Sequence, residues 1–186
     1  MMPQRLQREE YLKKLIAFQD KNIIKIITGI RRCGKSTLME IFQDHLRSTG
    51  VENSQILHIN FEDFDYRSLR DPAALHSYIT ERMARDRMTY VFLDEIQHVP
   101  DWQDVVDSLL IRKNLDIYIS VSNAYLLSSE IATLISGRYV EIKMLPLSFR
   151  EFVSATGGEA NLPKAYRQYV ESSSFPYALA LLDHPK

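Results

Sequence analysis

IIKIITGIRRCGKSTL, residues 23–38, joins a run of β-branched residues to a short, basic, glycine-containing loop. The run from Ile23 to Thr28 has the composition of a strand that is buried on both faces. The loop that follows, from Gly29 to Ser36, matches the pattern G-x-x-x-x-G-K-[ST]. A helix is expected from about Lys35 to Arg47, because Ser48-Thr49-Gly50 ends the helical pattern. The stretch therefore predicts a strand, a phosphate-binding loop (Walker A) and a helix in direct succession.

A loop of this kind holds phosphate groups with its backbone and with a lysine. Glycines let successive N–H groups turn toward phosphate oxygens, and the helix N-terminus adds a partial positive charge. Lys35 would reach the outer phosphates, and Ser36 would offer its hydroxyl to Mg²⁺. The residues expected to bind ATP are Gly29, Arg31, Arg32, Cys33, Gly34, Lys35, Ser36 and Thr37. For Arg31 and Arg32 a role as solvated loop charges is an equal alternative, and Cys33 would use its backbone N–H rather than its sulfur.

Apolar runs of strand length alternate with amphipathic stretches along most of the chain. Further strands are expected at residues 55–61, 90–94, 116–121 and 139–144, and further helices at 6–18, 72–87, 101–113 and 126–136. Five strands that alternate with helices predict an α/β, P-loop NTPase three-layer fold with a five-stranded parallel sheet and helices on both faces. Asp101 is the expected N-cap of its helix, and Trp102 is expected to anchor the core.

The pattern changes at Pro146, which marks a break. Beyond it, short helical stretches follow one another, at 163–170 and 175–182 among others, with no strand between them. We expect residues 1–145 to form a P-loop core, and residues 146–186 to form a helical lid or the start of a truncated second domain. The best linker candidate is GGEAN, residues 157–161.

Charge and composition limit the partners. The chain carries 23 Lys and Arg against 24 Asp and Glu, a net charge of −1, so the charge pattern does not support nucleic acid or an anionic membrane as a partner. One cysteine excludes a disulfide framework and suits a reducing cytosol, and the five histidines show no zinc-ligand spacing. No apolar run approaches the ~20 residues of a membrane span, and the charged N-terminus is unlike a leader. We expect a soluble, cytoplasmic protein.

YVFLDE, residues 90–95, supplies two carboxylates at the end of an apolar strand, in the position of a Walker B motif. Open α/β sheets bind their ligands at the carboxyl ends of the strands, so both should face the phosphate-binding loop. Asp94 would orient hydrated Mg²⁺, and Glu95 would polarise the water that attacks the terminal phosphate. The alternative is a strand that ends in two solvated acids. For Glu62 and Asp63, contact with Mg²⁺ water or with Arg138 is weighed equally with simple exposure.

Several segments together resemble a known family. They are GIRRCGKST (29–37), FED (61–63), FLDEIQHVPDW (92–102), SN (122–123), LLSSE (126–130), SGRY (136–139) and LPLSFREF (145–152). As an ordered set they are similar to the AAA+-like P-loop ATPases of bacteria and archaea, in which an AAA domain is usually followed by a second conserved domain. The resemblance covers nearly the whole chain, and it implies that residues 1–145 are a P-loop AAA-type ATPase core. The family usually carries T-G-S-N and G-G-F-P where this chain has Ser120–Asn123 and Ser173–Pro176.

The resemblance implies two further residues of an ATPase site. Asn123 would sense the γ-phosphate at the polar end of the fourth strand. Arg138 would be an arginine finger that reaches the nucleotide of a neighbouring subunit, which implies a transient homo-oligomer. Without the resemblance, a surface salt bridge is the favoured role for Arg138.

These observations lead to an expected function. The chain should hydrolyse ATP to ADP and phosphate with Mg²⁺, using Glu95, Asn123 and Arg138 for catalysis and Ser36 and Asp94 for the metal. The alternative is a nucleotide-dependent switch or scaffold with little hydrolysis, a role favoured by Val121 in place of the family's glycine. A DNA translocase would need a basic stripe and stacking aromatics, which the sequence does not offer. The protein client is left open by the sequence.

Overall fold

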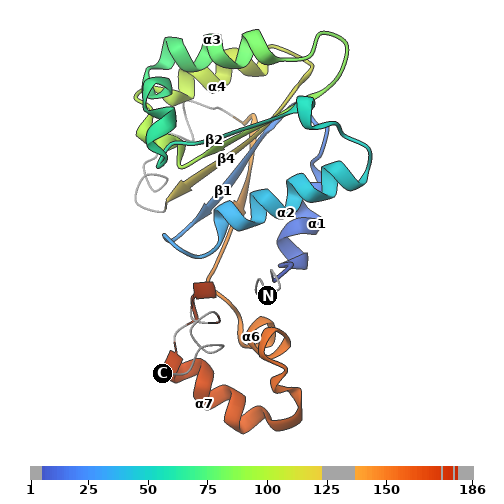
Figure 1. Cartoon of the computed structure of the whole chain (residues 1–186), viewed down its shortest axis with the longest axis vertical. Coiled ribbons are helices and arrows are strands. Elements are labelled where there is room, and N and C mark those ends of the chain that lie inside the picture. Colours follow the sequence, from blue (N-terminus) through green and yellow to red (C-terminus); the bar gives the residue numbers. More distant parts are fainter. Residues whose placement is uncertain (1–5, 123–136, 173, 178, 180–186) are drawn as a thin grey trace.

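A parallel sheet forms the centre of the molecule (Figure 1). The computed structural model describes residues 6–122, 137–172, 174–177 and 179. In this part of the chain the sheet has five strands in the order β2-β3-β4-β1-β5, and all neighbouring pairs are parallel. The strands are β1 Ile24–Gly29, β2 Ile56–Asn60, β3 Thr89–Asp94, β4 Leu115–Ser122 and β5 Tyr139–Lys143. The expected α/β fold with a five-stranded parallel sheet is confirmed.

Helices cover both faces of the sheet. The helices α1 and α2 lie on one face, and α3 and α4 lie on the other (Figure 1). The α-helices are α1 Glu9–Ala17, α2 Lys35–Ser48, α3 Pro72–Arg82, α4 Trp102–Leu110, α6 Phe149–Thr156 and α7 Leu162–Ser172. The short 3-10 helices are η1 Asn53–Gln55, η2 Phe64–Arg70, η3 Ile96–His98 and η4 Gly158–Asn161.

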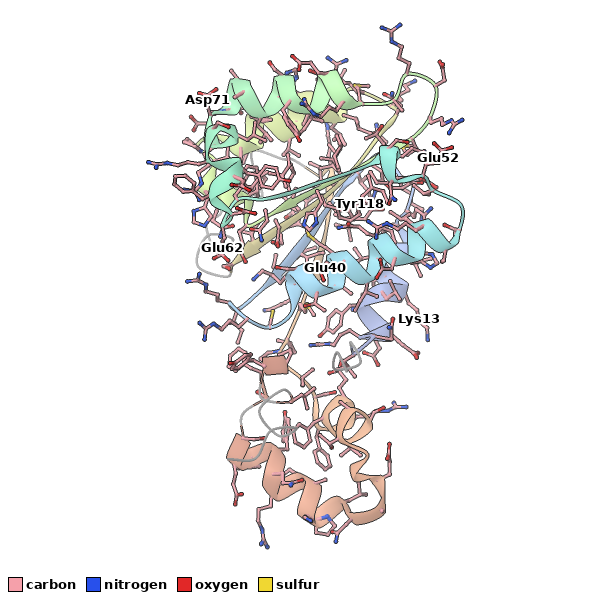
Figure 2. The ribbon with its side chains drawn as sticks, viewed as in Figure 1. Lys13, Glu40, Glu52, Glu62, Asp71 and Tyr118 are labelled. Carbon is pink, nitrogen blue, oxygen red and sulfur yellow. The ribbon has the colours of Figure 1, made fainter. Side chains whose placement is uncertain are left out.

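Side chains along each strand alternate between the two faces, so each strand contributes to two apolar cores. On β3, Val91 and Leu93 belong to the core beneath α3 and α4, whereas Phe92 belongs to the core beneath α2. The α2 side is aromatic: the rings of Phe92 and Tyr118 are stacked with their centroids 4.9 Å apart, and the Phe42 ring also lies 4.9 Å from Tyr118. Figure 2 shows Tyr118 in the interior, between the sheet and α2.

The carboxyl ends of the strands meet at one edge of the sheet. Gly29 of β1 lies beside Ser122 of β4, and Asn60 of β2 lies beside Asp94 of β3. Asp94 has the same parity as Phe92, so the alternation directs it to the α2 side. The segment between β1 and α2 begins at this edge, so the fold brings the phosphate-binding loop, Asp94 and Ser122 to the same place.

Several helices are shorter than expected. Before α1, Arg8 has a left-handed conformation with φ +47°, so this helix does not extend back to residue 6. The end of α3 is at Arg82 rather than residue 87, because Met83 is extended. Asp101 is the N-cap residue of α4, as expected, but it has a left-handed conformation and its side chain makes no capping hydrogen bond; α4 ends at Leu110 rather than residue 113. The helix expected at 126–136 lies outside the described residues.

After β5 the chain leaves the sheet and forms α6, η4 and α7, which lie apart from it in Figure 1. The two α-helices pack through aromatic rings, with the centroids of Phe152 and Tyr169 5.4 Å apart. The expected linker at 157–161 is a tight turn between these helices, since a Cβ on Gly158 would lie 2.9 Å from the Cβ of Ala165. Of the helix expected at 175–182, residues 178 and 180–182 lie outside the described part.

Candidate functional site

Two glycines shape the loop between β1 and α2, one through a close backbone approach and one through a left-handed conformation. A Cβ on Gly29 would lie 2.5 Å from the backbone oxygen of Met144 and 2.7 Å from Cys33 Sγ, so only glycine fits there. Gly34 has φ +102° and precedes α2, where it is also covered by Met144 Cε and Pro176 Cγ at 3.4 and 3.6 Å from a Cβ position. The first turn of α2 then presents N–H groups that have no partner within the helix. The loop has the backbone that an anion-binding site requires.

Lys35 begins α2 directly after this loop, and the residue is only 4% exposed. It donates to the backbone oxygen of Gly29 at 3.2 Å and to Ser122 Oγ at 3.2 Å. It also pairs with Glu95, with 3.1 Å between Nζ and Oε1. The structure therefore brings together the lysine of the first motif and the glutamate of the second, which follow β1 and β3 on either side of β4.

Glu95 follows β3 in a left-handed conformation, with φ +55°. Its N–H donates to Ser120 Oγ at 2.9 Å. Its Oε2 accepts hydrogen bonds from Ser122 Oγ, at 2.7 Å, and from Gln97 Nε2. Burial acts to raise the pKa of Glu95, but these hydrogen bonds and the Lys35 charge outweigh it, so the pKa lies below its ordinary value. The side chain is therefore a carboxylate at neutral pH, which is the form that accepts a proton.

Asp94 is fully buried at the end of β3. Its Oδ1 accepts a hydrogen bond from Ser120 Oγ. Its Oδ2 is also buried and has no hydrogen-bond partner among the residues that the structure describes. A buried carboxylate oxygen without a donor is a ligand that suits Mg²⁺ or a water bound to it. Ser36, in the first turn of α2, is the hydroxyl that the loop motif pairs with such an ion.

The other expected residues of the loop take different positions. Arg31 is exposed and donates to Glu62 Oε1 at 2.6 Å, so Glu62 contacts Arg31 rather than Arg138. Arg32 and Thr37 are exposed. Cys33 is buried, and burial raises the pKa of its thiol, which agrees with a structural role for this side chain.

Arg138 lies at the opposite edge of the sheet. Its backbone oxygen accepts from the N–H of Ile24, the first residue of β1, whereas the phosphate-binding loop follows the last residue of β1. Six strand residues separate the two edges by about 17 Å. The guanidinium pairs with Asp107 at 3.1 Å, and both side chains are about half exposed. Asn123 lies outside the described residues.

Sequence reasoning missed several side chains that contact the site. Ser120 and Ser122 lie on the α2 side of β4 and reach Asp94 and Glu95, while Val121 points the other way into the core beneath α3 and α4. Two serines that alternate with apolar residues at the carboxyl end of a buried strand are the signal that could have identified them. Gln97 stood in the quoted motif without an assigned role.

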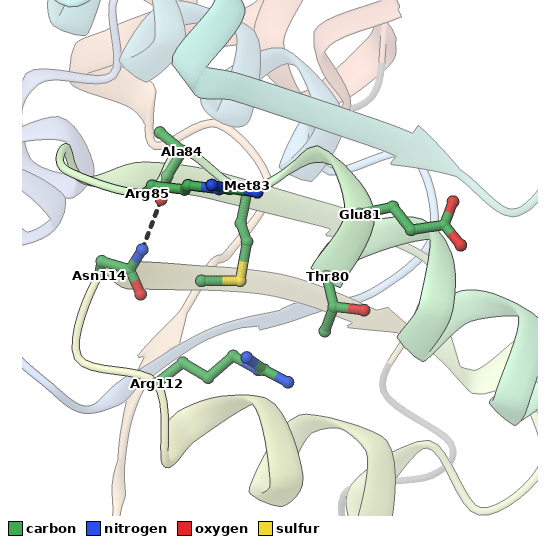
Figure 3. A pocket seen from close by; sticks show the side chains of 7 residues that line it. All are labelled: Thr80, Glu81, Met83, Ala84, Arg85, Arg112 and Asn114. Atoms are coloured by element: carbon green, nitrogen blue, oxygen red, sulfur yellow. Dashed lines mark hydrogen bonds between the residues drawn. The ribbon is translucent and has the colours of Figure 1, made fainter.

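A separate hollow of about 540 Å³ lies at the other end of the sheet (Figure 3). It is bounded by the end of α3 and by Arg112 and Asn114, which lead into β4, and Asn114 Nδ2 donates to the backbone oxygen of Ala84. None of the loop or carboxylate residues described above lines it.

Within the described part of the chain, no helix is long and apolar enough to cross a membrane.

Comparison with known proteins gives a family for this arrangement. Residues 21–153 match the model of the AAA domain family. A protein of Haemophilus influenzae, described as uncharacterized, is 42% identical over 184 residues, which are 97% of this chain and 46% of that protein. An uncharacterized protein of Methanocaldococcus jannaschii is 31% identical over 173 residues, which are 87% of this chain and 37% of that protein. The chain thus spans less than half the length of these two relatives.

Solved structures share the fold at low sequence identity. The Hsp104:casein complex of S. cerevisiae matches with a TM-score of 0.63 and 16% identity, over 94% of this chain and 36% of that chain. The Walker-type ATPase of Pyrococcus abyssi matches with 0.60 and 16%, over 98% and 69%. AMPPCP-bound DnaA from Aquifex aeolicus matches with 0.59 and 13%, over 95% and 60%. From its matched domain and its fold, the chain belongs to the AAA domain family, among the AAA+-like P-loop ATPases.

Proposed function

We propose that this chain binds ATP with Mg²⁺ and hydrolyses it to ADP and phosphate. The observation that carries the proposal is the contact of 3.1 Å between Lys35 Nζ and Glu95 Oε1 beside the loop. It puts a phosphate-binding cation next to a carboxylate that can accept a proton. A glycine loop alone would also suit a protein that binds nucleotide without hydrolysis. The adjacent Glu95 is what favours a hydrolase.

In the proposed reaction the loop backbone and Lys35 bind the phosphates. Glu95 accepts a proton from a water molecule while the water oxygen forms a bond with the γ-phosphorus. The bond between that phosphorus and the β–γ bridging oxygen breaks, and ADP leaves with the electron pair of that bond. For the metal, Ser36 and the Asp94 carboxylate are the residues that would hold Mg²⁺ or its water. When bound, Mg²⁺ neutralises charge on the phosphate oxygens.

We assign Arg138 the role of a finger that acts on a neighbouring copy. The position at the opposite edge of the sheet, about 17 Å from the loop, supports this role, because a guanidinium cannot span that distance within one chain. The salt bridge between Arg138 and Asp107 would then break when two copies meet. Its loss costs little free energy, because both side chains are about half exposed. Asn123, next to Ser122 at the end of β4, is proposed to sense the γ-phosphate.

Residues 1–145 are proposed to be the ATPase core, and residues 146–186 a helical lid or the start of a second domain. The position of Pro176 supports a lid, since its Cγ lies 3.6 Å from a Cβ position on Gly34 and so brings this segment against the loop. We propose a cytoplasmic location, which the free, buried thiol of Cys33 suits. A protein client is proposed without a specified identity.

The test compares two variants of the purified protein. Lys35→Ala should abolish ATP binding in calorimetry while the melting temperature stays near that of the wild type. Glu95→Gln should keep ATP binding and lower phosphate release by roughly 10² or more, the usual scale of a lost general base. The exposed Gln168→Leu serves as the control for both. Unchanged ATP affinity in Lys35→Ala would overturn the proposed site, and equal phosphate release by Glu95→Gln and wild type would favour the switch or scaffold.

A further inference from the structure

The two oxygens of the Glu95 carboxylate have different kinds of partner. Oε2 accepts from the Ser122 hydroxyl at 2.7 Å and from the Gln97 amide nitrogen. Oε1 lies 3.1 Å from the Lys35 ammonium. The carboxylate is thus held by neutral donors on one oxygen and by a mobile cation on the other.

The two neutral donors come from fixed parts of the fold. Ser122 ends β4, which lies between β3 and β1 in the sheet. Gln97 lies in the 3-10 helix η3 directly after Glu95, and the backbone of Glu95 is tied to Ser120 Oγ. The Lys35 ammonium, in contrast, sits at the end of four rotatable methylenes and can exchange the Glu95 oxygen for a phosphate oxygen.

We infer that Ser122 and Gln97 are positioning residues that fix Oε2 of Glu95, so that Oε1 becomes the proton acceptor when Lys35 moves to the phosphates. This inference rests on the proposed ATPase function and adds the atom and the two residues that orient it. The proton of the attacking water goes to Oε1, and the resulting hydroxide oxygen bonds to the γ-phosphorus. A carboxylate held on one oxygen cannot rotate the other away from the water, which is the benefit of an oriented base.

Each donor to this carboxylate that the described residues supply has a defined place. The Ser122 hydroxyl has one hydrogen, which goes to Oε2, and its oxygen accepts from Lys35 at 3.2 Å. When Lys35 leaves, Ser122 keeps its hydrogen bond to Oε2, because that bond does not depend on the lysine. The same holds for the Gln97 amide. The nucleotide therefore frees one oxygen of Glu95 without releasing the other.

The first experiment measures phosphate release by Gln97→Leu, which keeps the approximate size and removes the donor. We expect kcat to fall between about tenfold and a hundredfold, within what a general base supplies, while ATP affinity measured by calorimetry in EDTA stays within about twofold. In a Glu95→Gln background, Gln97→Leu should cause no further loss, because Gln97 acts through Glu95. The control is Gln168→Leu on the exposed face of α7. Equal losses in both backgrounds would overturn the inference.

The hydroxyl of Ser122 is tested by rescue. Ser122→Ala should lower kcat with little change in ATP affinity, and Ser122→Thr, which keeps the hydroxyl, should restore most of the activity. A packing role would instead give similar kcat for Ala and for wild type, or a joint loss of affinity and melting temperature. Either result would count against Ser122 as a positioning residue.

Crystal structures test, without any turnover, whether Ser122 and Gln97 hold the Glu95 carboxylate in place. In nucleotide-free Lys35→Ala, where no ammonium holds Oε1, the Glu95 carboxylate should keep its wild-type position, and it should leave that position when Gln97→Leu and Ser122→Ala are added. A carboxylate that stays in place in the triple variant would refute the inference. In wild type with a non-hydrolysable ATP analogue, Oε2 should remain bonded to Ser122 and Gln97 while Lys35 contacts phosphate. Failure of the analogue to bind would contradict the proposed function instead, and the nucleotide-free structures would still decide the positioning role.

Discussion

At the scale of single residues, the charge of the site comes from Lys35 and Glu95, and the orientation of Glu95 comes from uncharged side chains. Lys35 and Glu95 each belong to a short motif whose spacing is set by one turn after one strand, so their places follow from local pattern. Ser122 and Gln97 donate hydrogen bonds to Glu95 from uncharged groups, and such donors leave no signature in spacing or charge. Serine and glutamine are also common on surfaces, so composition does not separate the positioning role from solvent exposure.

His58 on β2 is a titratable residue whose pKa, like that of Glu95, is shifted by its surroundings. Its Nδ1 lies 3.2 Å from Gln43 Nε2, and its ring lies beside Phe92. Burial lowers the pKa of His58 below its ordinary value of 6.5, against the opposing charges of Asp94 and Glu40. The unfolded chain therefore binds more protons than the native one below about pH 6.5. The resulting loss of stability begins near that pH and grows as the pH falls toward the native pKa.

The expected result is a steeper pH dependence for the wild type than for His58→Gln. The free energy of unfolding, measured by urea titration at pH 7.5, 6.5 and 5.5, should decline more in the wild type over this range. Carboxylates that titrate in both proteins cancel in the difference. A parallel decline in the two proteins would show that His58 keeps an ordinary pKa in the native state.

At the scale of elements, strands are located better than helix ends. The strands follow from continuous apolar runs, whereas α1 and α3 are cut short by backbone conformations at Arg8 and Met83 that no periodicity reports. The start of α6 is the reverse case. Ser148 and Glu151 form a capping box, with Ser148 N–H donating to Glu151 Oε2 at 2.8 Å and Glu151 N–H donating to Ser148 Oγ at 3.3 Å. The signature S-F-R-E was in the sequence and predicts it.

Removing this cap should loosen α6. Ser148→Ala is expected to cost about 1 kcal/mol, since it removes the acceptor for the Glu151 N–H. Amide exchange in α6 should then accelerate by about fivefold, measured by hydrogen exchange at constant pH. Ser172→Ala, near the end of α7, is the control and should leave α6 unchanged. Equal exchange in the wild type and in Ser148→Ala would mean that packing on α7, rather than the cap, sets the stability of α6.

At the scale of the whole molecule, long-range contacts join segments that the sequence treats separately. Arg8 is 6% exposed and donates to the backbone oxygen of Leu145 at 2.8 Å, across 137 residues. It also pairs with Glu151 at 2.7 Å and reaches the backbone oxygen of Cys33 in the phosphate-binding loop at 3.4 Å. One guanidinium thus contacts the loop, the connection after β5 and α6. No local pattern reports such a contact, because its partners are mostly backbone oxygens.

Variants of Arg138 test whether the ATPase site is completed by a neighbouring copy of the chain. If Arg138 acts on a neighbouring copy, ATP turnover per molecule should rise with protein concentration, and Arg138→Ala should bind ATP but hydrolyse it poorly. Mixing Arg138→Ala with Glu95→Gln should restore part of the activity, because one interface then pairs an intact Glu95 with an intact Arg138. Arg112→Ala, another exposed arginine, is the control. Constant turnover over a hundredfold range, without rescue, would leave Arg138 with the Asp107 salt bridge alone.

The strand order has a consequence for the newly made chain. β1 ends at residue 29, yet its two neighbours in the sheet begin at residues 115 and 139. At a synthesis rate of about 5–20 residues per second, on the order of ten seconds pass between the emergence of the glycine loop and the arrival of the first strand that can pair beside it. During that interval the nascent polypeptide displays the complete loop sequence without the architecture that shapes it. Ribosome-bound intermediates that end before residue 115 should therefore fail to retain nucleotide, and that ability should emerge only late in translation.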